Sequence, residues 1–280
     1  MTDASPPPRT TIRTFRKWIR NGERAPMLTC YDASTARLLA DAGIQLLLAG
    51  DTAAQMILGH DSTLPAPMPF MLEITRAVRR GAPNALLMAD MPFGSYHCGD
   101  DEAMRHAVAF LKEADADWVK LEVDASHVPL VHRMASAGVP VVAHLGSRPQ
   151  QYKAAGGYVA AGRHEWEIEL LVETAGRMIE AGATALLLEA VPDAVSQRIV
   201  DRAIHPATGE PIPVIGCGAG PACHAHVVVL HDLLGISTWQ PPFAKPLADV
   251  GQAIRDAAAQ WGDEVRSGRY LAGGSPYNRK

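Results

Sequence analysis

Short apolar runs recur along the chain, and each is followed by a turn and a helix-length segment rich in alanine and charged residues. A weaker eighth run at 235–238 follows seven clear ones at 26–30, 45–49, 85–89, 118–121, 140–143, 184–188 and 213–215. Continuous apolar strands that alternate with helices are typical of parallel strands buried on both faces. The pattern therefore predicts an α/β fold built from repeated strand–helix units.

The number of units favours a single closed (β/α)8 barrel, a TIM barrel, over a doubly wound open sheet. Helix-length segments lie at 34–42, 101–114, 126–137, 165–181 and 194–203, and glycines that suit a helix stop follow at Gly43, Gly138 and Gly182. We expect a disordered tail at 1–10, the barrel with an N-terminal capping helix at 11–268, and a C-terminal tail at 269–280.

Composition narrows the possible partners and surroundings. The 280 residues are 48% hydrophobic and 20% charged, with a formal net charge of -4. The basic residues are dispersed, which argues against a nucleic-acid partner. No apolar run is long enough for a membrane span, and the N-terminus lacks an apolar signal core. Four cysteines are too few for a disulfide framework, so we expect a cytoplasmic protein.

Polar side chains end five successive apolar runs, from the second to the sixth. In chain order they are Asp51, Asp90, Glu122, His144 and Glu189. In a βα barrel the carboxyl ends of the strands form the rim that carries the chemistry. A single acid or imidazole at such a position is usually a helix cap or a satisfied structural group. Five on one rim indicate a functional site.

The acids in this series predict a bound cation, because like charges gathered on one rim repel unless something neutralises them. Asp51, Asp90 and Glu122 offer three carboxylates with no sulfur and little imidazole, a donor set that suits Mg²⁺ before Zn²⁺. Mg²⁺ keeps several waters, so some of the three would bind it through water. Lys120, beside Glu122, has three interpretations: a buried ion pair, charge neutralisation of an anionic substrate, or a Schiff-base amine.

The chain resembles the ketopantoate hydroxymethyltransferase family from about Arg13 to the region of Gly268. The blocks that carry the resemblance include Thr29-Cys30-Tyr31-Asp32, Gly50-Asp51-Thr52, Gly59-His60-Asp61-Ser62-Thr63, Arg79-Arg80-Gly81-Ala82-Pro83, Ala89-Asp90-Met91-Pro92-Phe93, Val119-Lys120-Leu121-Glu122, His144-Leu145-Gly146, Pro149-Gln150 and Leu188-Glu189. They occur in order and with similar spacing. The resemblance implies a barrel of the phosphoenolpyruvate mutase and isocitrate lyase group, assembled as a decamer.

The resemblance also implies a reaction and its residues. A hydroxymethyl group would pass from 5,10-methylenetetrahydrofolate to C3 of a branched 2-oxo acid, turning 3-methyl-2-oxobutanoate into 2-dehydropantoate. Mg²⁺ would bind at Asp51, Asp90 and Glu122. Thr52, Asp90 and Lys120 would contact the substrate, and His144 joins them on the rim. Glu189 would be the acid–base residue, and Lys120 would help to stabilise an enolate.

The sequence departs from the family pattern only on the rim. Thr52 stands where the family has serine, Val123 and Asp124 replace two glycines, and the stretches 53–55 and 221–226 also differ. Three interpretations follow. The first is the family reaction, and the second is a diverged relative acting on another 2-oxo acid as hydroxymethyltransferase, aldolase or lyase. The third is a non-catalytic oxo-acid-binding paralogue, against which the retained carboxylates, Lys120 and Glu189 argue.

Overall fold

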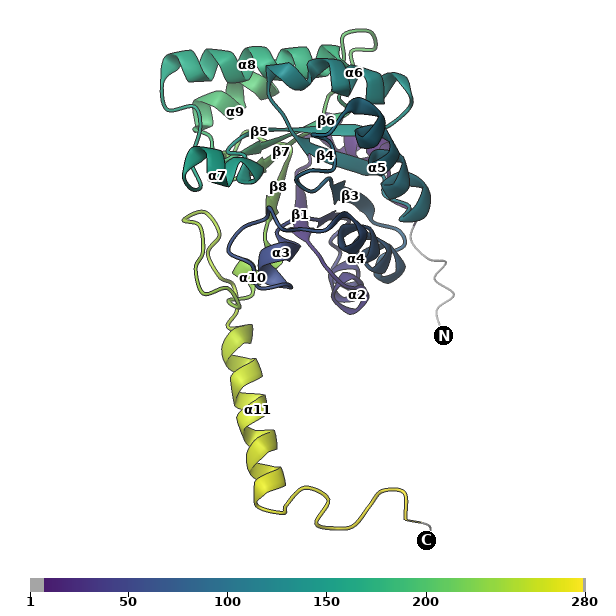
Figure 1. Cartoon of the computed structure of the whole chain (residues 1–280), viewed down its shortest axis with the longest axis vertical. Coiled ribbons are helices and arrows are strands. Elements are labelled where there is room, and N and C mark those ends of the chain that lie inside the picture. The colour runs from purple at the N-terminus through teal and green to yellow at the C-terminus, as the bar shows by residue number, and fades with distance from the viewer. Residues whose placement is uncertain (1–7, 279–280) are drawn as a thin grey trace. The chain divides into compact units, whose positions relative to one another are not determined.

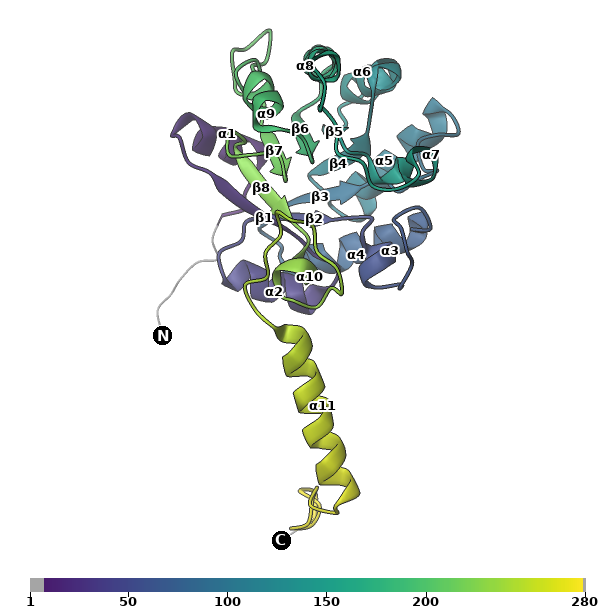
Figure 2. The same ribbon diagram turned by 90° about the vertical axis from the view of Figure 1, so that its left-hand side faces the viewer.

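Eight parallel strands close into one barrel in the order of the sequence (Figures 1 and 2). The computed structural model describes residues 8–278. The strands are β1 (Ala25–Thr29), β2 (Leu46–Ala49), β3 (Leu86–Asp90), β4 (Trp118–Glu122), β5 (Val141–Gly146), β6 (Ala185–Glu189), β7 (Val214–Cys217) and β8 (Ala225–Val228). Each strand pairs with the next, and β8 pairs with β1. The predicted (β/α)8 barrel is confirmed.

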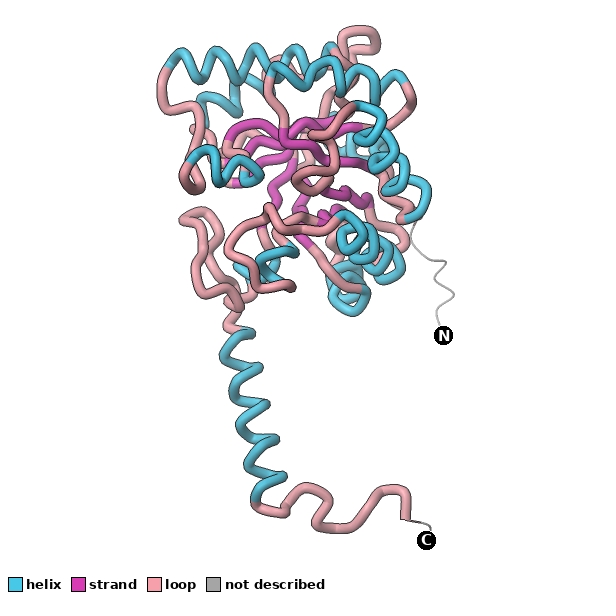
Figure 3. Tube along the Cα trace, viewed as in Figure 1, coloured by secondary structure: helices cyan, strands magenta, loops and turns pink. Residues whose placement is uncertain are grey.

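Helices surround the strands, as Figure 3 shows by colour. Those of residues 8–229 are α1 (Ile12–Arg20), α2 (Ala33–Asp41), α3 (Ala53–Met56), α4 (Met68–Gly81), α5 (Asp100–Glu113), α6 (Val128–Ser136), α7 (Tyr152–Ala155), α8 (Glu165–Glu180) and α9 (Asp193–Val200), with short 3-10 turns η1 (Ala125–His127) and η2 (Pro149–Gln151). Gly43, Gly138 and Gly182 have positive φ angles at the ends of α2, α6 and α8, as predicted.

The prediction of the eighth strand was wrong. Residues 235–238 form no strand, and β8 is instead Ala225–Val228. Ala225 and Val227 are buried in the barrel interior, whereas His226 between them is exposed. This strand therefore alternates polar and apolar residues, so a search for continuous apolar runs passed over it.

Alternation along the strands divides the apolar side chains between two layers. One buried cluster fills the barrel interior, with contributions from Met27, Leu48, Met88, Trp118 and Leu187. The intervening strand residues pack outward against the helices, as Val119 and Leu121 do from β4. Successive side chains of a strand point to opposite faces, which produces these two layers. At the carboxyl ends of the strands, polar residues occupy the inward positions and form the rim.

The Arg-Arg-Gly-Ala-Pro block has a structural role on the outside of the barrel. The buried Arg79 guanidinium donates to the backbone oxygens of Pro83, Ala85 and Asp115 at 3.1, 2.7 and 2.9 Å, and pairs with Asp117 Oδ2 at 2.6 Å. These bonds join α4 to the segments that lead into β3 and β4. Because several buried acceptors depend on one side chain, Arg79 is important for stability.

We expect Arg79→Met to lower the free energy of unfolding by about 3–5 kcal/mol, because it leaves Asp117 and the carbonyls without their buried partner. Urea denaturation followed by circular dichroism measures the change. The control is Arg80→Met on the adjacent, exposed residue, which should stay within about 0.5 kcal/mol of the wild type. Equal stabilities of the two variants would contradict the assigned role.

The predicted boundaries at residues 10 and 268 stay predictions, and the two ends of the chain are described by their contacts. Residues 1–7 of the expected tail lie outside the described residues, but Arg9 pairs with Asp115 and Asp117, and Thr10 N donates to Asn84 O at 2.8 Å. Among the described residues, 8–229 form one compact unit and 230–278 another, with α10 (Leu230–Leu233) and α11 (Val250–Arg266) in the second. All eight strands precede residue 230. Within residues 8–278, the helices are too short or too polar to cross a membrane.

Candidate active site on the rim of the barrel

The structure brings the predicted site residues together at the carboxyl ends of β2 to β6. Register pairs Asp90 with Lys120, Glu122 with His144, and Gly146 with Glu189 on neighbouring strands. Asp51 follows β2 directly and is buried, as are Asp90, Lys120, Glu122 and His144. The Glu189 side chain is 23% exposed, so it is the member of the group that solvent can reach from the barrel mouth.

Lys120 is held as an ammonium ion within this group. Its Nζ lies 2.8 Å from Asp90 Oδ2 and 3.3 Å from His144 Nδ1. Burial lowers the pKa of Lys120, but the charges of Asp90, Asp51 and Glu122 outweigh it and raise the pKa above its usual value. The ion pair that the sequence suggested with Glu122 is thus made with Asp90. An amine that stays protonated is a poor nucleophile, which argues against the Schiff-base interpretation.

Each of the three acids has one oxygen held by the protein. Asp51 Oδ2 accepts from Gln150 Nε2 at 2.9 Å, and Glu122 Oε2 accepts from Gln150 N at 3.0 Å. Asp90 Oδ2 accepts from Lys120 and from Asp51 N at 3.2 Å. Asp90 Oδ1 and Glu122 Oε1 are buried and accept no hydrogen bond from any residue in the described chain. Free carboxylate oxygens therefore remain inside a buried site.

The energetics of these acids call for another cation. Burial and the neighbouring Asp90 raise the pKa of Asp51 to about 8. Burial raises the pKa of Glu122 well above its usual range, although Lys120 opposes the shift. Both upward pKa shifts indicate that the single positive charge of Lys120 does not balance the negative charges of three buried carboxylates. A divalent cation beside the free oxygens would supply the missing positive charge.

The donor set fits a hard ion such as Mg²⁺ that keeps much of its water. Within residues 8–278, no group of three or more His, Cys, Asp or Glu side chains is arranged to hold a metal ion together. Mg²⁺ commonly takes one or two carboxylates directly and fills its other positions with water and substrate. Asp90 and Asp51 are adjacent, and Glu122 lies beside them.

His144 connects the cation side of the rim to Glu189. Burial and the Lys120 ammonium lower the pKa of His144, so the imidazole is neutral. Its Nδ1 faces Lys120 and therefore accepts, which leaves the proton on Nε2. Nε2 lies 3.4 Å from Glu189 Oε2. The protonated nitrogen of a neutral imidazole thus lies near the carboxylate that the sequence assigned to acid–base chemistry, without a hydrogen bond between them.

Thr52 is joined to a residue that sequence reasoning did not select. Its Oγ1 lies 2.6 Å from the Tyr31 hydroxyl, which comes from the segment after β1. Gln150, which donates to the carboxylates of Asp51 and Glu122, and Tyr96, which donates to Gln150, were also missed as site residues. Tyr31 and Gln150 occur within the blocks of the family resemblance, which was the available signal for them. Nothing in the spacing of polar residues indicates Tyr96.

Comparison with known proteins decides the family. A family model described as ketopantoate hydroxymethyltransferase matches residues 9–272, nearly the whole chain. The chain belongs to this family. Among its curated relatives, the 3-methyl-2-oxobutanoate hydroxymethyltransferase of Syntrophus aciditrophicus is 42% identical over 93% of this chain and 93% of its own. The enzyme of the same name from Ignicoccus hospitalis is 40% identical over 94% of this chain and 97% of its own.

Solved structures of other proteins share the fold of this barrel. 2,3-Dimethylmalate lyase, described as a phosphoenolpyruvate mutase/isocitrate lyase superfamily member, matches with a TM-score of 0.58 at 16% identity, covering 97% of this chain and 93% of its own. Phosphonopyruvate hydrolase matches with a TM-score of 0.60 at 14% identity, covering 96% and 93%. At these identities the likeness concerns the fold alone, and it agrees with the closed βα barrel of this chain.

The two departures after Glu122 do not enter the candidate site on the rim. Val123 is buried in the outer cluster between strands and helices. Asp124 caps η1 by accepting from Ser126 N at 3.0 Å, and it pairs with Arg148 at 2.7 Å. Burial alone would raise the pKa of Asp124, but the bonds from Ser126 and Arg148 lower it below its usual value. This carboxylate is already neutralised, so it does not act as a fourth acid of the rim.

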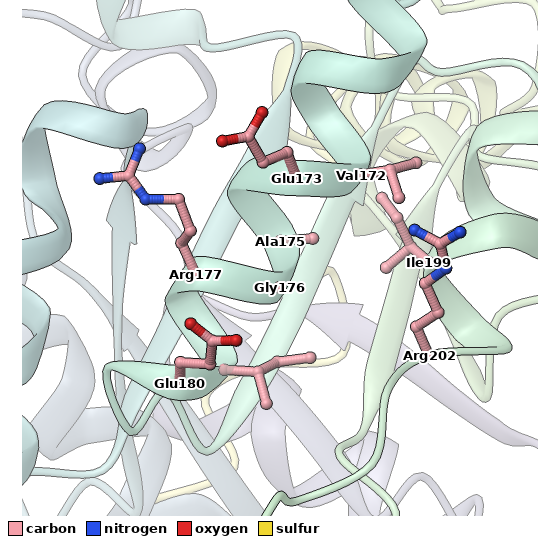
Figure 4. A pocket seen from close by; sticks show the side chains of 9 residues that line it. Val172, Glu173, Ala175, Gly176, Arg177, Glu180, Ile199 and Arg202 are labelled. Atoms are coloured by element: carbon pink, nitrogen blue, oxygen red, sulfur yellow. The ribbon is translucent and has the colours of Figure 1, made fainter.

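A surface pocket elsewhere on the molecule is a weaker candidate for ligand binding. Figure 4 shows it between α8 and α9, with Glu173, Arg177 and Glu180 from α8 and Arg202 from the turn after α9. No residue of the rim lines it. In a βα barrel the chemistry belongs to the carboxyl ends of the strands, and the buried, perturbed acids are there. We therefore place the family's active site on the rim.

Proposed function

We propose that this chain is a 3-methyl-2-oxobutanoate hydroxymethyltransferase, which transfers a one-carbon unit from 5,10-methylenetetrahydrofolate to C3 of the oxo acid and forms 2-dehydropantoate. The observation that carries the proposal is the rim itself. Buried carboxylates with free oxygens and a buried ammonium lie on one side, and Glu189 lies across His144 on the other. Membership of the ketopantoate hydroxymethyltransferase family supports the proposed substrates and product of this reaction.

Asp51 and Asp90 would hold Mg²⁺ directly, with Glu122 beside them or bound through water. When bound, this ion acts as a Lewis acid that polarises the ketone of the 2-oxo acid. The remaining chemistry belongs to the chain. Lys120 carries the positive charge that stabilises negative charge developing on the ketone oxygen. Thr52 offers a hydroxyl, positioned by Tyr31, to the oxo acid.

Glu189 takes the proton from C3, which leaves an enolate whose C3 attacks the methylene carbon. One carbon–carbon bond forms, and both carbon–nitrogen bonds of the methylene bridge break. A water supplies the new hydroxyl group, and its other proton and the C3 proton end on the two folate nitrogens. The partial exposure of Glu189 suits this role, because the base must face the mouth through which folate arrives.

The proposal extends to the assembly and location of the protein. The family resemblance implies a homo-oligomer, a decamer in the family, and a cytoplasmic biosynthetic enzyme. No residue of α11 is buried, and its exposed apolar side chains include Ile254, Trp261 and Val265. An amphipathic helix that leaves its apolar face uncovered is suited to packing against another subunit. Light scattering coupled to size exclusion measures the assembly directly.

The experiment that tests the function is a panel of 2-oxo acids with and without the folate donor, followed by NMR. We expect 3-methyl-2-oxobutanoate to exchange its C3 proton without the donor and to give 2-dehydropantoate with it, both dependent on Mg²⁺. No exchange with any 2-oxo acid would favour the binding-only paralogue. Product from a different acid, with none from 3-methyl-2-oxobutanoate, would replace the proposed acceptor.

A second candidate function is the same kind of reaction on a different 2-oxo acid, and Thr52 favours it. Its methyl occupies room beside the substrate that serine would leave open. The matched variant in the same panel is Thr52→Ser. If the methyl sets specificity, relative turnover of bulkier 2-oxo acids should rise in this variant, within the roughly 10–200-fold range that one methylene supplies. An unchanged ranking of the acids would assign no selectivity to that methyl.

A further inference from the structure

Gln150 occupies an unusual place behind the rim. It lies in η2, just after β5, and is 4% exposed. Its side-chain Nε2 donates to Asp51 Oδ2 at 2.9 Å and to Met91 O at 3.0 Å. Its backbone N–H donates to Glu122 Oε2 at 3.0 Å. One residue therefore contacts two of the three acids through two different groups.

The orientation of the Gln150 amide is fixed by Tyr96, which is also buried. The Tyr96 hydroxyl donates to Gln150 Oε1 at 2.6 Å and accepts from Glu122 N at 3.2 Å. Turning the amide over would bring its oxygen against the Met91 carbonyl oxygen, which has no proton to offer, and against Asp51 Oδ2, which has none when Asp51 is ionised. The amide therefore has one favourable orientation, with its N–H groups toward Asp51.

The consequence is geometric. A carboxylate with one oxygen fixed by a donor presents the other oxygen in a defined direction, and Gln150 fixes one oxygen of Asp51 and one of Glu122. The second oxygen of Glu122 remains free and buried. Groups that orient ligating carboxylates from behind are a general feature of metal sites, and their loss weakens metal affinity.

We propose that Gln150 is a positioning residue that aims Asp51 and Glu122 at a common divalent cation, with Tyr96 holding its amide in the orientation this requires. The inference rests on the proposed function only for the identity of the cation. Gln150 does not touch the reacting atoms. The absence of charge on its amide matters as much as the position of that amide beside Asp51. An acid in its place would add a fourth charge to the rim and could not donate to Asp51 when ionised.

The test is direct Mg²⁺ binding to the full-length protein by isothermal titration calorimetry, with the variant Gln150→Met. Methionine has nearly the same length and is apolar, so it removes the amide with little change in volume. We expect the dissociation constant for Mg²⁺ to rise about 10–100-fold. At saturating Mg²⁺, kcat should recover to near the wild-type value, because the reacting groups are unchanged.

Two further variants sharpen the result. Gln151→Met makes the same substitution at the next residue, which is exposed, and should bind Mg²⁺ as the wild type does. Tyr96→Phe frees the amide while leaving Gln150 in place, and should weaken Mg²⁺ binding in the same direction but less. It also serves as the decisive variant if Gln150→Met does not fold, which circular dichroism reports.

The outcomes separate this inference from the proposed function. Wild-type Mg²⁺ affinity in folded Gln150→Met, or in folded Tyr96→Phe if the first variant does not fold, overturns the positioning role. A wild-type protein that binds no Mg²⁺ overturns it too. If the wild type binds Mg²⁺ but makes no 2-dehydropantoate, and Gln150→Met still loses affinity, the positioning role stands while the proposed reaction fails.

Discussion

Replacing Asp90 by asparagine is expected to lower kcat/KM by on the order of 10³-fold, which corresponds to the several kcal/mol that a metal ion supplies in stabilising charge. Asp90 Oδ2 already serves Lys120 and Asp51 N, and Oδ1 is the free oxygen. An asparagine that keeps its oxygen toward Lys120 places an NH2 group where that free oxygen stood. An amide NH2 does not ligate a cation, so calorimetry should also show Mg²⁺ binding lost or greatly weakened.

The control for this variant is Asp124→Asn, the same substitution at a half-exposed acid two residues after Glu122. Asp124 is turned to Arg148 and to the start of η1, so its replacement should leave Mg²⁺ binding and turnover little changed. Similar losses in both variants would indicate a general effect of negative charge on the rim. Unchanged activity and Mg²⁺ binding in Asp90→Asn would show the metal hypothesis to be wrong.

Much of the barrel was predictable because seven of its strands are continuous apolar runs. Such a run needs both faces covered, and the residue that ends it falls on the rim whatever the helices do. That logic found Asp51, Asp90 and Glu122 from chain order alone. It failed for β8, where His226 faces outward between Ala225 and Val227.

The residues behind the rim were not predictable from spacing, because their contacts join distant parts of the chain. Gln150 reaches Asp51 across 99 positions of sequence, and Tyr96 reaches Gln150 across 54. The type of a residue did not indicate where its side chain points either. In the sequence, Asp124 looks like another acid of the rim, two residues after Glu122. In the structure its carboxylate pairs with Arg148 and caps η1. Deciding this required the positions of the loops after β4 and β5.

Glu189→Gln is expected to lower kcat by about 10²–10⁴-fold, the usual contribution of a positioned general base. Glutamine keeps the shape of the side chain and can still meet His144 Nε2 through its amide oxygen, so binding of the oxo acid should change little. The loss should therefore appear in kcat and in C3 proton exchange, with a much smaller change in KM. Steady-state kinetics and deuterium exchange at C3 followed by NMR measure the two effects separately.

The exchange measurement also identifies which proton Glu189 moves. Loss of both exchange and product formation assigns Glu189 to C3, because exchange requires no folate. Normal exchange with lost product formation would move its role to the folate nitrogen, and wild-type behaviour in both would remove it from catalysis. Glu173→Gln is the matched control, since Glu173 lines the pocket on α8 (Figure 4), and no residue of the rim lines that pocket. Its kinetics should match the wild type, because neutralising a carboxylate there changes no group that meets the substrate.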